Sequence, residues 1–436
     1  MPDPLERAAA QPDAATTVAP DVAEEIAGDV AADDVENGAN VHCFVCQLDT
    51  RVCEVAALEG MLEGVTERLG GQPIPAAKLR LASGELAVIA LNDHARPLVA
   101  ALAALELERL RGLRLRVYHL WRGSPVASGA YVRYHTNAQS VVALEPDLLL
   151  NITDINNAEY CVRQYPLRRM TPSTPNAATI KGQVIHTAFK EMLKAGQAEV
   201  AAPLEQALRG QAAEIGLRQL DADVIRAEAE PHMAALAQWY GSQRANLWAS
   251  APDIRAETFL LAPEVGLKGR LDVYMRDVGG DALLELKTGQ ARTDLPKREH
   301  RWQVYGYQTL LTVRQPPERR KPAATLLYSG TSGQAEGHTI PFTARDLRRV
   351  LELRNQLALT HATGAVPAPP GGAKCARCAL HTACERASAL LGWEAPPSET
   401  PPVPVPPEDA AWFARMYGLL GMEARAAEAE GQALWR

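Results

Sequence analysis

The sequence lacks several features that would have placed it in other classes of protein. No stretch has the form G-x4-G-K-[S/T], the loop that cradles nucleotide phosphates, and Gly266-Leu-Lys-Gly269 is without the required ending. No ATPase is therefore expected. The longest apolar runs are too short to span a membrane, and no apolar stretch typical of a signal peptide opens the chain. We therefore expect a cytoplasmic protein.

The sequence also has no excess of basic residues, and its formal net charge is −7. The acidity is concentrated in residues 1–38, where ten acidic residues and one basic residue contribute −9. Subtracting −9 from −7 leaves +2, so the total charge does not argue against a nucleic-acid partner. The many alanines, prolines and like charges predict that residues 1–38 form a disordered tail.

Two carboxylates and a lysine lie in two short apolar runs separated by Gly279-Gly280. The runs predict a β-hairpin, with Asp272 in the first strand and Glu285 and Lys287 in the second. Because side chains alternate along a strand, Glu285 and Lys287 point to the same side. The pattern D-x12-E-x-K predicts a site for a hard divalent cation beside a lysine, and it matches the core of PD-(D/E)XK nucleases. A solvated hairpin is the alternative.

Three cysteines lie close together in the pattern Cys375-x2-Cys378-x5-Cys384, and Cys161 precedes them by more than two hundred residues. Thiolate sites are usually four-coordinate, so the trio needs a fourth ligand. Zinc and buried structural thiols are two interpretations. A distant cysteine joined to a compact trio is instead the arrangement of iron–sulfur RecB-like nucleases. The seven cysteines show no paired disulfide framework, which predicts a reducing compartment.

Two further patterns lie between these cysteines. Gly182 and His186 precede an amphipathic run, which places His186 near the start of a helix, where its imidazole could join a metal shell. A satisfied core histidine is the alternative. Gln303 and Tyr307 share one face of a predicted helix, where they could hold a DNA strand or orient Lys287.

Taken in this order, the motifs resemble those of the PD-(D/E)XK RecB-like iron–sulfur nucleases. The nuclease half of the eukaryotic nuclease–helicase that trims Okazaki flaps and resects broken DNA ends is the most similar. The resemblance covers roughly residues 146–390 and includes GLKGRLD, LELKTG, EHRWQ, LLYSG and LRNQLA. It is looser for CRISPR-associated nucleases of spacer acquisition and for the AddB subunit of bacterial end-processing complexes. The helicase half is absent, so a separate helicase or ATPase subunit is the expected partner.

This resemblance implies a role for each matching residue. The implied metal ligands are His186, Asp272, Glu285 and the carbonyl of Leu286. Lys287 would be a general base or an electrostatic group, and Gln303 and Tyr307 would contact DNA. The implied ligands of a 4Fe–4S cluster, which staples the two ends of the domain, are Cys161, Cys375, Cys378 and Cys384. Oxygen-rich ligation favours Mg²⁺ at the catalytic site, and the histidine also suits Mn²⁺.

The expected fold class is α/β, with a restriction-endonuclease-like PD-(D/E)XK core, a helical insertion over residues 200–250 and an iron–sulfur staple. A small OB-like β-barrel, expected to hold single-stranded DNA, precedes this core. The barrel prediction includes strands at VHCFVCQLD and LRVYHLWRG and one helix at RPLVAALAALELERLRG. The expected segments are an acidic tail (1–38), the barrel (39–145), the nuclease domain (146–392), a Pro-rich linker (393–409) and a C-terminal helix (410–436).

Three groups of residues carry open alternatives. The C-x2-C-x6-C pattern of Cys43, Cys46 and Cys53 is either a second metal site or a set of strand thiols. The C-terminal helix either packs on its own domain or docks a helicase, and its helically spaced apolar residues are Trp412, Met416, Leu419 and Leu420. Basic side chains near the motifs either contact DNA phosphates or are solvated, and they are Arg163, Arg168, Arg169 and Arg301.

These features predict a metal-dependent nuclease specific for single-stranded DNA. It would process ends or flaps in repair, replication or anti-phage defence, either as an exonuclease or as a flap endonuclease. Two alternatives remain, a non-catalytic iron–sulfur scaffold that binds DNA in a helicase complex and a spacer-acquisition nuclease. The complete Asp-Glu-Lys set argues against the first, and the extra N-terminal domain argues against the second.

Overall fold

The computed structural model describes most of the chain after residue 53. The described residues are 54–125, 131–171, 174–247, 253–277, 280–289, 296–316, 319–330, 333–398 and 404–433. The predicted acidic tail, the strand VHCFVCQLD and the cysteines Cys43, Cys46 and Cys53 lie outside them. No helix in this part of the chain is long and apolar enough to cross a membrane. The chain divides into two units, Met1–Pro146 and Asp147–Arg436.

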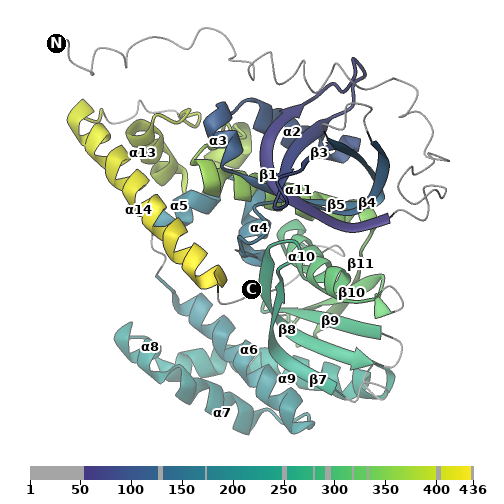
Figure 1. Cartoon of the computed structure of the whole chain (residues 1–436). Helices are drawn as coiled ribbons and strands as arrows, with labels where there is room; N and C mark the ends of the chain where they lie inside the picture. Colours follow the sequence, from purple (N-terminus) through teal and green to yellow (C-terminus); the bar gives the residue numbers. More distant parts are fainter. Residues whose placement is uncertain are drawn as a thin grey trace. The chain divides into compact units, whose positions relative to one another are not determined.

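The first unit contains a closed barrel with the strand order β1-β2-β3-β5-β4 (Figure 1). Its strands are β1 (Glu54–Thr66), β2 (Ala76–Leu81), β3 (Leu86–Ala90), β4 (Arg114–Pro125) and β5 (Val132–Leu144). β3 and β5 pair in parallel, and the other neighbours pair antiparallel. Inward-facing aliphatic residues such as Leu62, Leu79 and Ile89 are fully buried, so the barrel interior is a packed hydrophobic core.

The prediction of a single helix between β3 and β4 is wrong. A 3-10 turn, η4 (Asp93–Ala95), is followed by two short helices, α2 (Arg96–Ala103) and α3 (Leu107–Arg111). Both helices pack against β1. The turn after Ala103 lets Leu102 and Leu110 both reach the core, where each is almost completely buried. Burial of apolar side chains has therefore overridden the helix propensity of this Leu- and Ala-rich segment.

The second unit is built on a mixed sheet with the order β11-β10-β9-β8-β6, and β7 pairs with β8. Its strands are β6 (Leu150–Asn151), β7 (Asp253–Ala262), β8 (Leu267–Asp277), β9 (Gly280–Lys287), β10 (Ala323–Tyr328) and β11 (Glu336–Pro341). The antiparallel pairing of β8 and β9 confirms the predicted hairpin. Gly280 has φ +121°, and a Cβ at this position would lie 2.6 Å from the carbonyl oxygen of Arg319, so the turn requires glycine.

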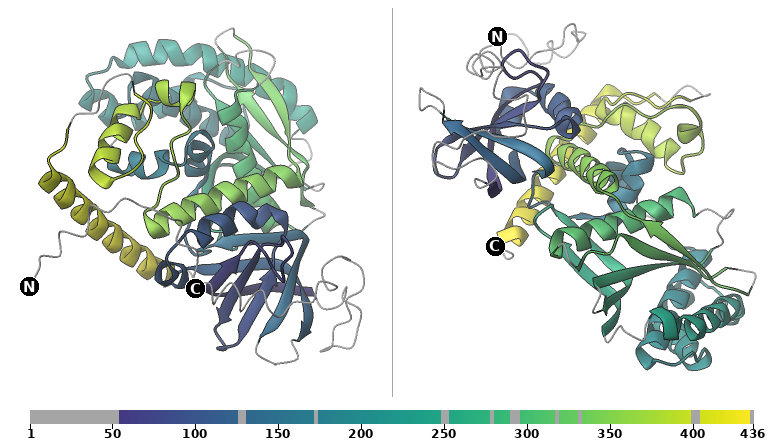
Figure 2. Two further views of the ribbon diagram at one scale, coloured as in Figure 1. Left: turned by 90° about the horizontal axis from the view of Figure 1, so that it is seen from above. Right: turned by 90° about the vertical axis from the view of Figure 1, so that its right-hand side faces the viewer.

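Helices cover both faces of this sheet (Figure 1, Figure 2). A core cluster joins the sheet to α6 (Ala177–Ala195), α7 (Ala201–Gly210), α8 (Ala212–Leu217) and α9 (Ala222–Leu247). Leu284 and Leu286 of β9 belong to this cluster. The alternation of side chains then turns Glu285 and Lys287 to the opposite face, where α10 (Arg298–Arg314) contacts the strands. Two layers of helices thus enclose the strand that carries the predicted catalytic pair.

The helix that carries His186 begins earlier than expected. The side chain of Asn176 accepts a hydrogen bond from the N–H of Thr179, so α6 starts at Ala177. His186 therefore lies in the middle of this helix, and the prediction that it lies near a helix start is wrong. The error followed from treating Gly182 as a boundary, although the helix continues through it.

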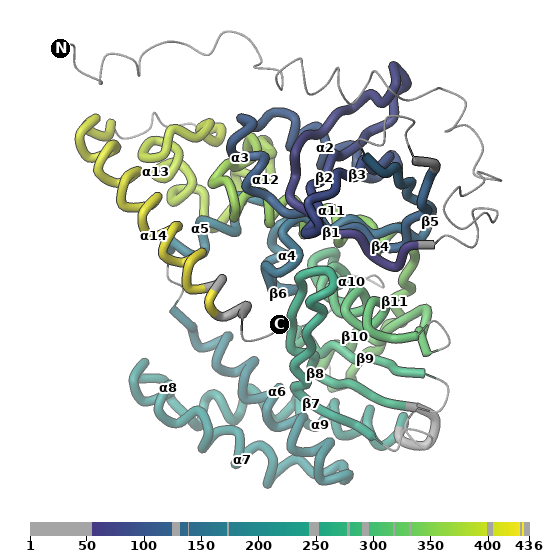
Figure 3. Tube along the Cα trace, in the orientation of Figure 1, coloured from purple at the N-terminus to yellow at the C-terminus, as the bar shows by residue number. Residues whose placement is uncertain are grey.

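Remote segments of the second unit meet around the cysteines. The chain passes from β6 into α4 (Ile152–Tyr160) and then into α5 (Gln164–Met170), as Figure 3 shows. The C-terminal part supplies α11 (Ala344–Thr363), α12 (Gly372–Ala376) and α13 (His381–Leu391), and α13 packs against α5. The first and last parts of this unit are thereby brought side by side.

The last helix, α14 (Pro407–Ala433), begins inside the segment expected to be the linker. A proline is well suited to the first turn of a helix, which explains the earlier start. α14 packs along α13. Of the apolar residues expected to form its packing face, Met416 is half-buried, whereas Trp412, Leu419 and Leu420 are exposed.

Candidate active site

The predicted acidic residues meet where β8 and β9 separate. Regular pairing of the two strands runs from Asp277 and Gly280 to Val273 and Leu284 and stops there. Beyond this point Asp272 turns its side chain toward β9, and its Oδ2 accepts a hydrogen bond of 2.7 Å from the N–H of Leu286. Its Oδ1 lies 3.1 Å from Nδ1 of His186. The fork between the strands therefore presents the two oxygens of one carboxylate to two different surroundings.

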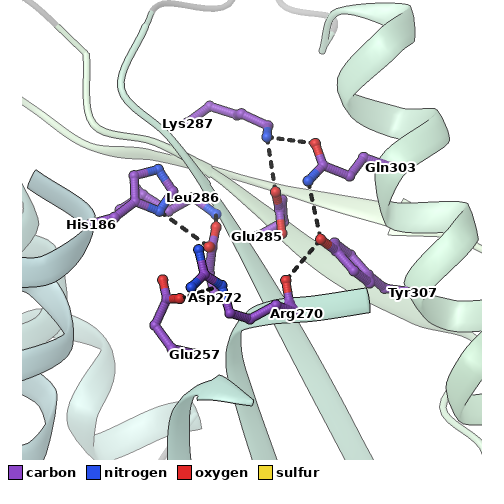
Figure 4. A network of polar contacts seen from close by, with 9 residues as sticks. All are labelled: His186, Glu257, Arg270, Asp272, Glu285, Leu286, Lys287, Gln303 and Tyr307. Atoms are coloured by element: carbon purple, nitrogen blue, oxygen red, sulfur yellow. Dashed lines mark hydrogen bonds and ion pairs between the residues drawn. The ribbon is translucent and has the colours of Figure 1, made fainter. Parts of the chain in front are cut away.

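A chain of hydrogen bonds continues from β9 to α10 (Figure 4). The Nζ of Lys287 donates to Oε1 of Glu285 at 2.8 Å and to Oε1 of Gln303 at 2.7 Å. The Nε2 of Gln303 donates to the hydroxyl of Tyr307 at 3.2 Å, and this hydroxyl donates to the carbonyl of Arg270 at 2.8 Å. The expected shared face of Gln303 and Tyr307 is confirmed by this contact. The side-chain amide of Gln303 therefore holds the ammonium group of Lys287 in place and links it, through the hydroxyl of Tyr307, to the backbone of β8.

Tyr307 lies where α10 and β8 approach each other closely. A Cβ on Gly269 would lie 2.8 Å from Cε1 of Tyr307 and 3.0 Å from Cγ1 of Ile152. Only glycine therefore lets the ring lie this close to the strand. The tyrosine is almost completely buried, so its hydroxyl needs the two polar partners that it has.

Burial and mutual repulsion control the charges of the fork. Burial, and then the charge of Asp272, raise the pKa of Glu285 to about 7. Burial alone would also raise the pKa of Asp272, but His186, Lys287 and the Leu286 N–H outweigh it and hold that pKa below its usual range. Burial opposes the charge of Lys287, yet Glu285 and Asp272 raise its pKa above the ordinary value. The lysine is therefore a cation at neutral pH.

The donor set of the fork suits a hard cation. Oε2 of Glu285 is buried and has no hydrogen-bond partner among the described residues. An uncompensated carboxylate oxygen in the interior is costly, because it has lost its water without gaining a partner. A divalent cation with oxygen ligands would supply that partner. The N–H of Leu286, which contacts Asp272, orients the carboxylate.

Glu257, an acidic residue that belongs to no sequence motif, lies beside Asp272. Among the described residues, potential ligand atoms of His186, Glu257 and Asp272 all lie within 4.8 Å of one another. Glu285 is outside this trio. Sequence analysis missed Glu257, because it stands in β7 in a run without a recognisable pattern. The signal that would have found it is its position opposite Asp272 in the pairing of β7 and β8, which requires knowledge of the register.

The four predicted cluster cysteines come together in one pocket. The lining of this pocket includes Cys161, Cys375, Cys378 and Cys384, together with Tyr160 and Arg163. Cys161 directly follows α4, and the other three lie on or beside α12 and α13. All four are free thiols. Burial, the largest influence, raises the pKa of Cys161. The arrangement provides four sulfur ligands from both ends of the second unit.

The structure contradicts the prediction that Arg163 contacts DNA. Its side chain is 1% exposed, because its guanidinium donates to the carbonyls of Pro367 at 2.7 Å and Glu394 at 2.6 Å. It also lies 3.8 Å from Sγ of Cys384. No carboxylate is paired with it among the described residues. A buried cation normally needs a negative partner, so Arg163 belongs to the environment of the thiols.

The other predicted DNA-contacting arginines lie on or near the surface. Arg168 is exposed and bonds to Oε1 of Gln164. Arg169 is exposed, lies over the ring of Tyr165 at 3.9 Å and contacts His361. Arg301 is half-buried near the start of α10. These positions leave the prediction of phosphate contact open for all three.

Comparisons with known proteins bear on this geometry. The model of the "PD-(D/E)XK nuclease superfamily" matches residues 150–385, which is more than half of the chain. Similar solved structures include the crystal structure of SSO0001, at 15% identity and a TM-score of 0.24, which covers 52% of this chain and 95% of that one. Another is a "Putative exonuclease" from Eubacterium rectale, at 15% identity and a TM-score of 0.36, with coverages of 54% and 87%. No curated protein matches the chain at a significant level.

Proposed function

The chain belongs to the PD-(D/E)XK nuclease superfamily, and on this premise we propose that it is a metal-dependent nuclease that cleaves single-stranded DNA at ends or flaps. The observation that carries the proposal is the fork of β8 and β9, where Asp272, Glu285 and Lys287 converge. Hydrolysis of a phosphodiester requires a positioned water and neutralisation of the charge that develops on the phosphate. The buried acids and the fixed lysine are suited to both tasks.

Mg²⁺ is the proposed physiological cation, with Mn²⁺ as a competent substitute. The residues that would hold it are Asp272, Glu285, His186 and the carbonyl of Leu286. The buried oxygen of Glu285 without a partner supports this assignment. When bound, such a cation supplies Lewis-acid chemistry, which neutralises the scissile phosphate and favours ionisation of the attacking water.

The protein's own groups supply orientation and positive charge. Lys287 is held by Glu285 and Gln303, and its raised pKa keeps it protonated at neutral pH. It is therefore better suited to stabilise negative charge on the transition state than to remove a proton from water. Gln303 and Tyr307 keep the lysine in place by a hydrogen-bonded path that ends on the backbone of β8.

A 4Fe–4S cluster is proposed for the pocket of four cysteines. The sulfurs come from two segments of the chain that are far apart in sequence, so a bound cluster would fasten the start of the second unit to its end. The buried guanidinium of Arg163 supports a negatively charged group here, because thiolate ligands give such clusters net negative charge. Its proposed role is structural, in a reducing cytoplasm.

The N-terminal barrel is proposed to hold single-stranded DNA. A five-stranded barrel with the order β1-β2-β3-β5-β4 supports an OB-like assignment, and OB-folds bind single strands on one face. A separate helicase or ATPase subunit is the proposed partner that would deliver unwound DNA. The pathway would be repair, replication or anti-phage defence.

Two other functions make different predictions. A non-catalytic iron–sulfur scaffold would bind DNA but would not cleave it, whichever divalent cation is supplied. The complete set of Asp272, Glu285 and Lys287 argues against a site that has lost its activity. A spacer-acquisition nuclease would associate with an integrase rather than a helicase. Co-purification with an integrase would favour the spacer-acquisition nuclease, whereas DNA binding without cleavage in any divalent cation would favour the scaffold.

One experiment tests the nuclease and the cluster together. The protein is purified anaerobically, its iron and sulfide are quantified, and end-labelled single-stranded and flapped DNA are digested with Mg²⁺. We expect about four irons per chain, and cleavage that is absent in Asp272→Ala. Equal cleavage by this variant would overturn the site. Iron without cleavage in Mg²⁺ or Mn²⁺ would favour the scaffold, and zinc in place of iron would overturn the cluster.

A further inference from the structure

His300 lies about one helical turn before Gln303 on α10. Residues with this spacing share a helix face, and Gln303 uses that face to contact Nζ of Lys287 at 2.7 Å. On the sheet, Tyr328 pairs with Lys287 in the parallel register of β10 and β9. The hydroxyl of Tyr328 lies 2.8 Å from Nδ1 of His300. The helix and the sheet thus hold this imidazole beside the lysine of the candidate active site.

The hydroxyl of Tyr328 determines which nitrogen of the imidazole carries the proton. The backbone N–H of Lys297 donates to the hydroxyl oxygen at 3.1 Å, and an N–H cannot accept a bond in return. The hydroxyl proton is therefore directed to Nδ1 of His300, the acceptor that it contacts among the described residues. A neutral imidazole that accepts at Nδ1 carries its own proton at Nε2. His300 consequently offers an N–H donor at Nε2.

The surroundings of His300 leave this donor neutral and open to a ligand. Burial, and then the charge of Lys287, lower the pKa of His300 to about 4, so the ring is uncharged at neutral pH. His300 is half-buried, and its Nε2 has no hydrogen-bond partner among the described residues, yet this atom is not sealed from solvent. A second cation at this place would be repelled by the ammonium group of Lys287. A neutral N–H adds a hydrogen-bond donor without that repulsion.

We propose that His300 binds a non-bridging phosphate oxygen of the DNA strand through the N–H of Nε2, beside the group on which Lys287 acts. Many contacts to DNA phosphates come from uncharged donors. A ring that stays neutral has no ready proton for a leaving group, so the role of His300 is to bind and orient the strand. The inference rests on the proposed function and deepens it, because it adds a DNA contact that carries no charge.

The test measures the Kd of a fluorescent oligothymidylate for the full-length, cluster-containing protein at neutral pH, in EDTA so that no cleavage occurs. Fluorescence anisotropy gives the Kd at several salt concentrations. His300→Ala is expected to weaken binding about 10- to 100-fold, the scale of a hydrogen bond to a charged group. The slope of log affinity against log salt should stay that of the wild type, because this slope counts charged contacts. His300→Gln should restore most of the affinity, since its amide N–H can replace the N–H of Nε2.

Two further variants separate the contact from the packing around it. Tyr328→Phe keeps the aromatic ring but removes the hydroxyl that orients the imidazole, so it should weaken binding less than His300→Ala does. The matched control is His338→Gln. His338 lies on β11 with its ring 5.7 Å from that of Tyr328, so this change disturbs the surroundings of the same tyrosine. It should leave both the affinity and the salt slope of the wild type unchanged.

Each outcome separates this inference from the proposed function. If His300→Ala binds the oligothymidylate as tightly as the wild type, the inference is overturned, and the proposed function survives as long as cleavage still requires Asp272. A loss of affinity that His300→Gln does not restore would assign His300 a structural role. A loss accompanied by a salt slope smaller by about 0.7 would show a charged contact, and either result also overturns the inference. A wild-type chain that neither binds nor cleaves single-stranded DNA overturns both.

Discussion

At the scale of the residue, the fork places charges where a protein interior usually excludes them. Glu285 is 2% exposed and keeps one carboxylate oxygen without a hydrogen-bond partner among the described residues. Lys287 and Asp272 are also shielded from solvent. Buried charges of this kind are typical of functional sites, and they lower the stability of the protein when no cation is bound.

Replacing Glu285 with glutamine should expose this conflict. Gln keeps an acceptor for Lys287 but removes the buried charge, so the free energy of unfolding without divalent cations should rise by about 1–3 kcal/mol. Cleavage should be lost. Denaturant unfolding with and without Mg²⁺ measures the effect. Mg²⁺ should stabilise the wild type more than the variant, because a ligand stabilises only the state that binds it. A variant that is less stable than the wild type without Mg²⁺ would contradict the argument.

At the scale of the element, the site depends on how closely α10 approaches β8. Gly269→Ala places a methyl group 2.8 Å from the Tyr307 ring, so the ring or the strand must shift. We expect a loss of about 1–3 kcal/mol in stability and weaker cleavage, because Tyr307 supports Gln303. Gly216→Ala is the control. It lies in α8 with open space around it, so it should stabilise the protein by about 0.5–1 kcal/mol. Equal effects of both variants would show that the contact is not tight.

The contact between α10 and β10 makes stability depend on pH. Burial, and then the charge of Lys287, lower the pKa of His300 to about 4 from 6.5, and its Nδ1 lies 2.8 Å from the hydroxyl of Tyr328. Above pH 6.5 both the folded and unfolded chains are neutral at this histidine, so its contribution is constant. As the pH falls below 6.5, the unfolded chain takes up a proton that the folded chain refuses until about pH 4, and stability is lost.

The variant His300→Gln should therefore unfold with a flatter pH dependence between pH 6 and pH 4.5. One proton corresponds to a slope of at most about 1.4 kcal/mol per pH unit. Urea denaturation at several pH values gives the free energy of unfolding. His94→Gln, at an exposed histidine, should leave the slope of the wild type unchanged. Parallel curves for His300→Gln and the wild type would rule out this origin of acid sensitivity.

At the scale of the whole molecule, the four cysteines connect the beginning of the second unit with its end. Cys161→Ser should release iron, lower the melting temperature of this unit and reduce cleavage, because the proposed cluster loses one of four ligands. Iron analysis and thermal unfolding under anaerobic conditions measure both effects. A triple serine variant of Cys43, Cys46 and Cys53 should keep its iron. If Cys161→Ser also keeps its full iron content, the pocket is not a cluster site.

The parts of this site that are local in the chain could be predicted from the sequence. Asp272, Glu285 and Lys287 belong to one hairpin, and Gln303 and Tyr307 belong to one helix turn, so periodicity was enough to predict that they meet. Glu257 escaped notice because its relation to Asp272 is a matter of strand register. Arg163 misled because its charge predicts solvent exposure, whereas the fold buries it among carbonyl groups and a sulfur atom. The packing of distant segments decides such cases, and it has no short signature in the chain.

The nine-residue helix α4 has contacts at both of its ends. At its first residue, Ile152 fits against Gly269 and Gly306, beside the seat of Tyr307, and at its last the chain passes directly into Cys161. If the four thiols hold the proposed cluster, its loss would disturb α4 at one end and, through Ile152, the packing of α4 on β8 at the other. Loss of that proposed cluster would then lower cleavage although the acids of the fork are unchanged. On exposure to air, iron and cleavage should decay at the same rate.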